Sequence, residues 1–148
     1  MKNLYISFLF TCLLFSCTFY QSMEKEVDCP SLTSPKGTEE VVLKSNEKID
    51  TYIGFRGISS ICFKKDNHIL MNLDVNLRSI RKKYDLDDYI SIRISLVSID
   101  INKKEFNRDD FNYRHFLKKN NKIVDRLTSM SVKVPENGKV LIGILKSN

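Results

Sequence analysis

The sequence contains no tryptophan, and in 148 residues it has only two histidines, three prolines and five glycines. The missing tryptophan argues against an antibody-type domain, which buries that residue between its sheets. The HExxH, GxSxG, GxxxxGK[ST] and GxGxxG motifs are also absent. These patterns carry the chemistry of zinc peptidases, serine hydrolases, P-loop nucleotidases and dinucleotide-binding enzymes. We therefore expect a protein that is not an enzyme.

The residues that could still serve catalysis are isolated in the sequence. His68 follows a predicted turn, and His115 lies in an aromatic segment. A lone histidine is far more often a surface or satisfied core residue than a general base. The acidic candidates are Asp85, Asp87 and Asp88 in one segment and Asp109 with Asp110 in another. Adjacent loop carboxylates usually face solvent, and neither group has the spacing of an EF-hand loop.

No cofactor or metal is expected from the cysteines and histidines. Neither Cys29 nor Cys62 belongs to a CxxC pair, and His68 and His115 form no ligand-spaced set with them. The aromatic side chains of residues 106–117 offer a candidate ligand groove, although a strand face of this composition is more often core. These side chains are Phe106, Phe111, Tyr113 and Phe116.

The chain begins with the layout of an export signal. One cation, Lys2, precedes an uncharged and largely apolar run from Leu4 to Tyr20. Within this run, Leu14-Phe15-Ser16-Cys17 resembles the lipobox of bacterial membrane lipoproteins. The resemblance implies a signal peptide over residues 1–16, cleavage before Cys17, and transfer of a lipid with palmitate-type acyl chains to the Cys17 thiol. An uncleaved helix and an ordinary secreted protein are the alternatives.

The same resemblance implies a location. Thr18, rather than Asp, follows Cys17, and in that family this favours transport to the outer membrane, facing the periplasm, over retention on the inner membrane. The partners expected are then the membrane, through the N-terminal lipid, and a protein of the cell envelope. Nucleic acid is a poor partner for an exported chain, although the formal net charge is +6.

The lipoprotein interpretation accounts for two of the four cysteines. Cys12 is removed with the signal peptide, and Cys17 is acylated. Cys29 and Cys62 remain, and in an oxidising compartment we expect them to form a disulfide. Two buried free thiols are the alternative. The basic segment from Arg78 to Lys83 is followed at once by Asp85, Asp87 and Asp88, so it is interpreted as a solvated loop.

The mature chain divides into a lipidated tether over residues 17–28 and one domain over residues 29–148. The tether could reach roughly 35 to 40 Å when extended. Beyond Gly37 the apolar residues recur mainly with period two, the pattern of half-buried strands. The predicted strands are residues 41–44, 50–55, 58–64, 71–78, 90–96, 106–117, 130–134 and 140–145.

Two segments allow alternatives. Residues 67–84 also carry apolar residues at helical spacing, which would make the domain α+β with one helix, but alternation fits Met71 and Val75 better. After Leu96 the apolar parity moves to Val97, Ile99 and Ile101, which predicts a bulge or a strand end buried on both faces.

Six to eight strands joined by short turns predict an all-β fold, an antiparallel β-sandwich of immunoglobulin-like or transthyretin-like architecture. The leading functional hypothesis is a structural or interaction module that docks other envelope components through edge strands or loops. The alternative is a binding module for a lipid, a glycan or another anionic ligand, which predicts a basic or aromatic concavity.

Overall fold

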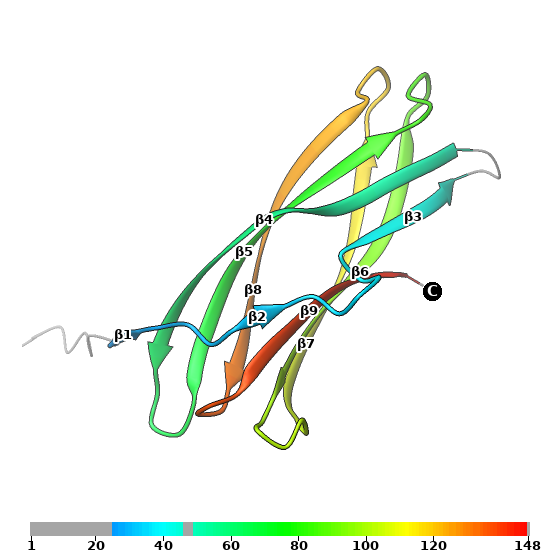
Figure 1. The fold of residues 1–148 in the computed structure, drawn as a ribbon. Coiled ribbons are helices and arrows are strands. Elements are labelled where there is room, and N and C mark those ends of the chain that lie inside the picture. The colour runs from blue at the N-terminus through cyan, green and yellow to red at the C-terminus, as the bar shows by residue number, and fades with distance from the viewer. Residues whose placement is uncertain (1–24, 46–48, 148) are drawn as a thin grey trace, which may run out of the picture.

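The protein is an antiparallel β-sandwich, as predicted. The computed structural model describes residues 25–45 and 49–147, and within these ranges it has nine strands and no α-helix. Seven of the strands are long, and two have only two residues each. Figure 1 shows an elongated, twisted molecule in which the two sheets lie face to face. In the part of the chain described, no helix is long and apolar enough to cross a membrane.

The first sheet has five strands. Its order is β1 (Glu26–Val27), β4 (Ile49–Lys64), β5 (Ile69–Arg81) and β8 (Ile123–Val134), and β3 (Glu40–Ser45) also pairs with β4. All of these pairings are antiparallel. We call this sheet A.

The second sheet, sheet B, has four strands. Its order is β2 (Leu32–Thr33), β9 (Lys139–Lys146), β6 (Asp88–Ile99) and β7 (Glu105–Leu117). β2 runs parallel to β9, and the other pairings are antiparallel. The chain therefore crosses from sheet B to sheet A between β2 and β3. The turns β4–β5, β6–β7 and β8–β9 lie at one end of the molecule, and the β5–β6 and β7–β8 turns lie at the other (Figure 1).

The core forms where the alternating apolar residues of the two sheets meet. On β5 the inward residues Met71, Leu73, Val75 and Leu77 are buried, and on β6 the inward residues are Ile90, Ile92, Ile94 and Leu96. The period-two pattern between residues 69 and 81 thus describes a strand, and the alternative helix over 67–84 is not formed. Side chains at period two fill one face of a sheet, whereas a helix would leave Val75 off its apolar stripe.

The parity change after Leu96 arises from burial on both faces and not from a bulge in β6. Leu96 and Ser98 are both fully buried on the inner face. Val97 and Ile99 lie on the outer face, where they are partly covered. The register does shift between Ser98 and Ile99, but the extra residue, Phe106, is on β7. Of the two alternatives, the strand end buried on both faces is therefore the one observed.

The outer cover of sheet B comes from the segment between β2 and β3. The carbonyl of Thr38 accepts a hydrogen bond of 2.7 Å from the Ile144 amide, and its side chain packs above Gly143. A Cβ atom at Gly143 would lie 2.8 Å from the Cβ of Thr38, so only glycine lets the two backbones approach this closely. The segment therefore shields the middle of β9 from solvent.

Two elements have boundaries that differ from the sequence prediction. Residues 50–55 and 58–64 form one strand, β4, because a bulge at Arg56 absorbs the break between Phe55 and Gly57 without interrupting the pairing. β8 begins at Ile123 and not near Met130. Its first half was missed because Ile123 and Leu127, its large apolar residues, face solvent.

The interpretation of Arg78 to Lys83 as a solvated loop is correct for Lys82 and Lys83, which are exposed outside the strands, and wrong for residues 78–81. Arg78 to Arg81 form the end of β5, and Arg81 has no exposed surface. The run of charged residues predicted a loop because the period-two pattern of a strand is recognised from its apolar residues, and a charged residue at an inward position interrupts it. Arg81 has the same parity as the buried residues before it, and the strand carries it into the interior.

Candidate interaction surfaces

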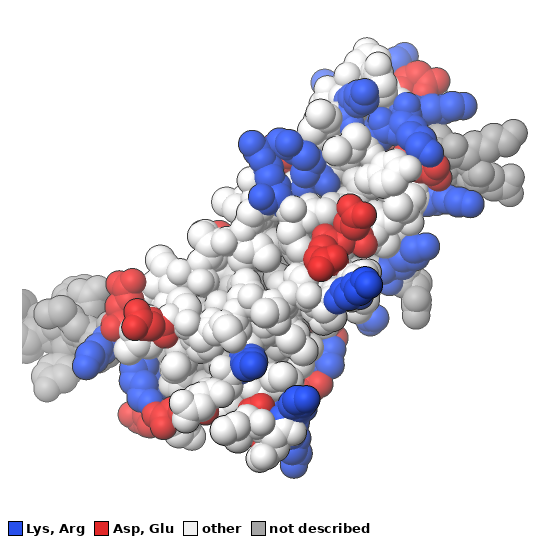
Figure 2. Space-filling view, viewed as in Figure 1, with Lys and Arg blue, Asp and Glu red and all other residues white. Residues whose placement is uncertain are grey.

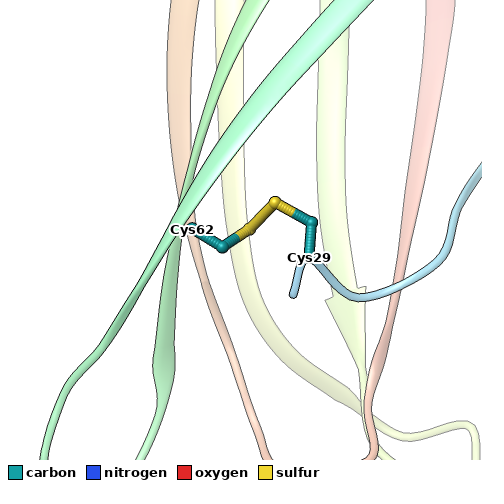
Figure 3. Close-up of a disulfide and its surroundings, with 2 residues drawn as sticks. All are labelled: Cys29 and Cys62. Atoms are coloured by element: carbon teal, nitrogen blue, oxygen red, sulfur yellow. A yellow bond between two sulfur atoms is a disulfide. The ribbon is translucent and has the colours of Figure 1, made fainter. Parts of the chain in front are cut away.

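The predicted disulfide is present. Cys29 is bonded to Cys62, with 5.2 Å between their Cα atoms (Figure 3). Cys62 is fully buried on β4, opposite Met71 on β5. Both the alternative of two free thiols and a metal role for these cysteines are thereby set aside. Cys12 and Cys17, with the whole Leu14 to Cys17 motif, lie outside the described residues.

The disulfide sits where the N-terminal chain joins the domain. Just before it, Glu26 pairs with Phe63 and Val27 pairs with Cys62, which adds β1 to the edge of sheet A. The Lys64 amide also donates a hydrogen bond of 2.9 Å to the Lys25 carbonyl. A pull on the N-terminus is therefore carried by a covalent bond to β4, the longest strand in the described part of the chain, and not by hydrogen bonds alone.

The two histidines lie in unrelated places. His68 is in the β4–β5 turn, where its Nδ1 is 2.8 Å from the Asn67 Oδ1. His115 is buried on the inner face of β7, and its Nε2 accepts a hydrogen bond of 3.0 Å from the Arg126 Nε. Their observed partners are thus an amide and a guanidinium, a pattern unlike the carboxylate-oriented base of a hydrolase.

Burial makes His115 hard to protonate. Loss of hydration, and secondarily the charge of Arg126, lowers its pKa from 6.5 to about 4. The geometry agrees, because an Nε2 atom that accepts a hydrogen bond from a guanidinium carries no proton of its own. His115 is therefore a neutral packing residue at neutral pH.

We expect the stability of the protein to fall between about pH 6.5 and pH 4 because of His115. In this window the unfolded chain takes up a proton on the imidazole and the folded chain does not, so acid favours unfolding by up to about 3 kcal/mol. Urea unfolding at pH 7 and pH 4.5 measures the loss. His115→Gln keeps an acceptor for Arg126 but does not titrate. This variant should therefore lose most of the pH dependence of the free energy of unfolding. If the wild type and His115→Gln lost the same free energy of unfolding between pH 7 and pH 4.5, His115 would not be the source of the pH dependence.

Asp87 and Asp110, two of the five acidic candidates, make structural contacts. The Asp87 Oδ1 accepts a hydrogen bond of 2.6 Å from the Lys119 amide, which ties the β5–β6 turn to the β7–β8 turn. Asp110 lies 3.7 Å from Arg108 across the outer face of β7. No group of three or more metal-ligating side chains occurs in residues 25–45 and 49–147.

Three of the four aromatic side chains of β7 are not core, contrary to the favoured interpretation. Phe106, Phe111 and Phe116 are all more than a third exposed, and only Tyr113 packs against the core. They do not gather in one concavity either. Phe116 packs against Tyr89 on the outer face in a tilted arrangement, with ring centroids 4.9 Å apart, whereas Phe111 stacks on Tyr113 on the inner face. The predicted aromatic groove is therefore not formed by these four residues.

A groove that the sequence did not predict lies on the outer face of sheet B. Its volume is about 360 Å³. The floor is apolar, from side chains of β6 and β9, and the segment between β2 and β3 closes one side. The floor residues are Val97, Ile99, Leu141 and Leu145, and the polar rim includes Ser95, Lys103, Glu105 and Arg108. Arg108 is held over Glu105 at 2.7 Å and donates a 3.0 Å hydrogen bond to Ser95, so much of the rim charge is compensated.

A row of exposed apolar side chains crosses the outer face of sheet A. Val42 pairs with Tyr52, Tyr52 with Ile80, and Ile80 with Ile123, so the row spans β3, β4, β5 and β8. The four residues are between 36% and 52% exposed. Single exposed apolar residues are ordinary on protein surfaces, but a contiguous row is typical of an interaction surface.

Ion pairs border this row on both sides. On one side Asp50 pairs with Lys82 at 2.7 Å. On the other, Asp125 accepts hydrogen bonds of 2.7 and 2.8 Å from Arg78 and one of 2.6 Å from Arg56. The hydrogen bonds from Arg78 hold the pKa of Asp125 below its ordinary value. Figure 2 shows a largely uncharged area on this face, bordered near the middle by acidic side chains, and most of the Lys and Arg visible in this view lie toward the end that carries the β5–β6 and β7–β8 turns.

The turns at that end are held together by Arg81. Its Nη2 donates a 2.6 Å hydrogen bond to the Leu86 carbonyl, and its Nη1 reaches the carbonyls of Leu117 and Lys118 at 3.4 and 3.1 Å. The Asn120 amide also donates to the Tyr84 carbonyl at 2.6 Å. The end of the sandwich opposite β1 is thus a rigid cap that presents Tyr84 and Leu86 to solvent.

Sequence patterns could have revealed part of these surfaces. Tyr52, Ile80 and Ile123 have the solvent-facing parity of their strands, which marks them as exposed once the strands are known. Their alignment into one row depends on strand register, for which the sequence carries no local signal. The groove depends on how the segment between β2 and β3 crosses sheet B, which is equally invisible in the pattern.

Comparisons with known proteins assign no family. No protein-family model matches the chain, and no curated protein matches it. Among solved structures, the trimeric lipoprotein SadB of Salmonella enterica is similar, with a TM-score of 0.33 and 13% sequence identity. The alignment covers 97% of this chain and 73% of that one. A likeness at this level carries no argument about function.

Proposed function

We propose that this protein is a lipid-anchored module of the bacterial cell envelope whose β-sandwich docks other envelope proteins and has no catalytic role. The observation that carries the proposal is the Cys29–Cys62 disulfide beside the N-terminal junction, combined with the lipobox-like Leu14 to Cys17 ahead of it. Disulfides persist in exported proteins and are rare in the reducing cytosol. A chain that is exported and acylated at Cys17 would therefore gain such a bond at the base of its tether.

The shape of the molecule supports a docking role. In Figure 1, β1 lies next to the β4–β5 turn, and the β5–β6 and β7–β8 turns lie at the far end. Hydrogen bonds from Arg81 join these two turns into the cap. A tether on β1 would hold the first end near the membrane and direct the second away from it. The exposed apolar row lies on sheet A close to this cap, because Ile80 is the next-to-last residue of β5 and Ile123 is the first residue of β8. The groove lies on the outer face of sheet B, and both surfaces are accessible to partners.

The groove also bears on the alternative of an anionic-ligand module. That function calls for uncompensated cations or exposed aromatic rings around a concavity. The groove has an apolar floor and no aromatic lining, and its Arg108 is already paired with Glu105. These features fit an apolar side chain of a docked protein better than an anionic head group, and we rank docking first.

Metabolic labelling with a palmitate analogue tests the proposal. The full-length protein should incorporate the label, and Cys17→Ser should lose it entirely because no other thiol meets the transferase. Cys12→Ser is the matched control, since it also removes a cysteine from the N-terminal run and should label normally. Incorporation that survives Cys17→Ser would refute lipid anchoring at this residue. Crosslinking in the membrane fraction of labelled cells then identifies the docked partners.

A further inference from the structure

The edge strand β7 has one unpaired side. It is the outermost strand of sheet B, and in the described part of the chain it pairs only with β6. An edge strand of 13 residues presents a row of backbone amides and carbonyls that can pair with another strand. The opposite edge of sheet B is formed by the two-residue strand β2, so β7 is the long edge of this sheet.

The middle of β7 is open toward the interior side as well. Phe111 faces inward, opposite Ile94, which is fully buried, yet Phe111 is 38% exposed. β8, across the sandwich, contacts β7 near its two ends. The Asn107 Oδ1 accepts a 3.1 Å hydrogen bond from the Lys133 amide, and Arg126 reaches His115. Between these contacts the stacked rings of Phe111 and Tyr113 lie beside the open edge.

We infer that a second copy of this chain pairs with β7, as an antiparallel β7–β7 contact whose twofold axis passes through Asn112. A twofold axis normal to the sheet places residues with numbers that sum to 224 opposite each other, on the same face. In this register the opposed pairs are Asp110 with Arg114, Phe111 with Tyr113, Arg108 with Phe116, and Asp109 with His115.

The charges of β7 favour this register. Asp110 and Arg114 both lie on the outer face, opposite Ser95 and Ser91 of β6. Asp110 of each copy would therefore lie opposite Arg114 of the other copy, which gives two such ion pairs in the dimer. On the inner face, each Phe111–Tyr113 stack would meet the same stack of the partner copy, which buries four rings. The Nε2 of His115 accepts a hydrogen bond from Arg126, so its Nδ1 carries the ring proton. This N–H can donate a hydrogen bond to the Asp109 carboxylate of the other copy.

Neighbouring registers are disfavoured by the same residues. An axis through Phe111 would oppose Arg108 to Arg114, and an axis through Tyr113 would oppose Arg108 to Lys118. Axes through Asp110 or Arg114 would oppose these residues to themselves. Like charges directly across a strand pair are destabilising. The charged side chains therefore favour the register centred on Asn112 over the four registers centred on Asp110, Phe111, Tyr113 and Arg114.

This inference deepens the proposed function by naming one docked partner, and it rests on that function only for the compartment. Crosslinking between copies is read from the mass of the protein, whether or not Cys17 is acylated. Loss of palmitate labelling and loss of the dimer are thus separate results, and either proposal can fail alone.

Cysteine crosslinking of the full-length chain in intact cells tests the pairing. Asn112→Cys places two thiols beside the axis, so a short bismaleimide should yield a covalent dimer. The matched control is Asn72→Cys, also an exposed strand asparagine, on the central strand β5 of sheet A. The dimer fraction of Asn112→Cys should exceed that of the control several-fold, and equal fractions would overturn the inference.

Charge reversal tests the register. In the Asn112→Cys background, Asp110→Arg or Arg114→Asp alone opposes like charges and should lower the dimer fraction several-fold. The double variant restores opposite charges across the axis and should recover the original fraction. Formation of the Cys29–Cys62 disulfide in each variant shows that it has folded. A folded double variant that stays monomeric would mean that the register is wrong.

Discussion

Replacing Arg81 with methionine should destabilise the protein by about 3 kcal/mol, because the Leu86, Leu117 and Lys118 carbonyls lose their common donor in a buried site. Methionine fills a similar volume, so the loss reports the hydrogen bonds and not a cavity. The free energy of unfolding, from urea titration at pH 7, measures the effect. Hydrogen exchange should also quicken at Asn120, whose amide bonds to the β5–β6 turn.

Arg78→Met is the matched control for this experiment. Arg78 lies on the same strand as Arg81 and points to the opposite, outer face, where it pairs with Asp125. Its side chain is about a third exposed, and ion pairs at such positions contribute little to stability because water screens the two charges. If Arg78→Met cost as much as Arg81→Met, burial of Arg81 would not be the source of the stability.

Removing the disulfide should have an effect of similar size. The bond closes a loop with a sequence separation of 33 residues, and on the chain-entropy model such a loop stabilises the fold by about 4 kcal/mol. The Cys29→Ala, Cys62→Ala double variant should lose this amount. It should also release β1, since Val27 pairs directly with Cys62.

Reductant provides the control for the disulfide. Dithiothreitol should lower the melting temperature of the wild type and leave that of the double variant unchanged. The two treatments differ in chemistry but remove the same constraint, so their losses should agree. A wild-type protein with two alkylatable thiols and no response to reductant would show that the bond does not form in cells.

Local pattern was sufficient for most of the fold. The alternation of Met71 to Leu77 and of Ile90 to Leu96 predicted two central strands correctly, because half-buried strands impose their period on the residues themselves. The disulfide was predicted from cysteine number and compartment. The failures lie where polarity and burial disagree, as with Arg81, which is charged and buried, and Phe111, which is apolar and exposed.

The sequence by itself determined the all-β class, the strands with one solvent-exposed face and the disulfide between Cys29 and Cys62. Each of these depends on the properties of neighbouring residues or on the number of cysteines alone. Tertiary structure alone decided which strands are edges, which residues share a row and what Arg81 contacts. Sheet order and register arise from pairing between segments distant in the chain, such as β5 with β8, and no local period records them. The open edge at β7 and the apolar row on sheet A therefore came only from the structure, while the lipobox-like motif came only from the sequence.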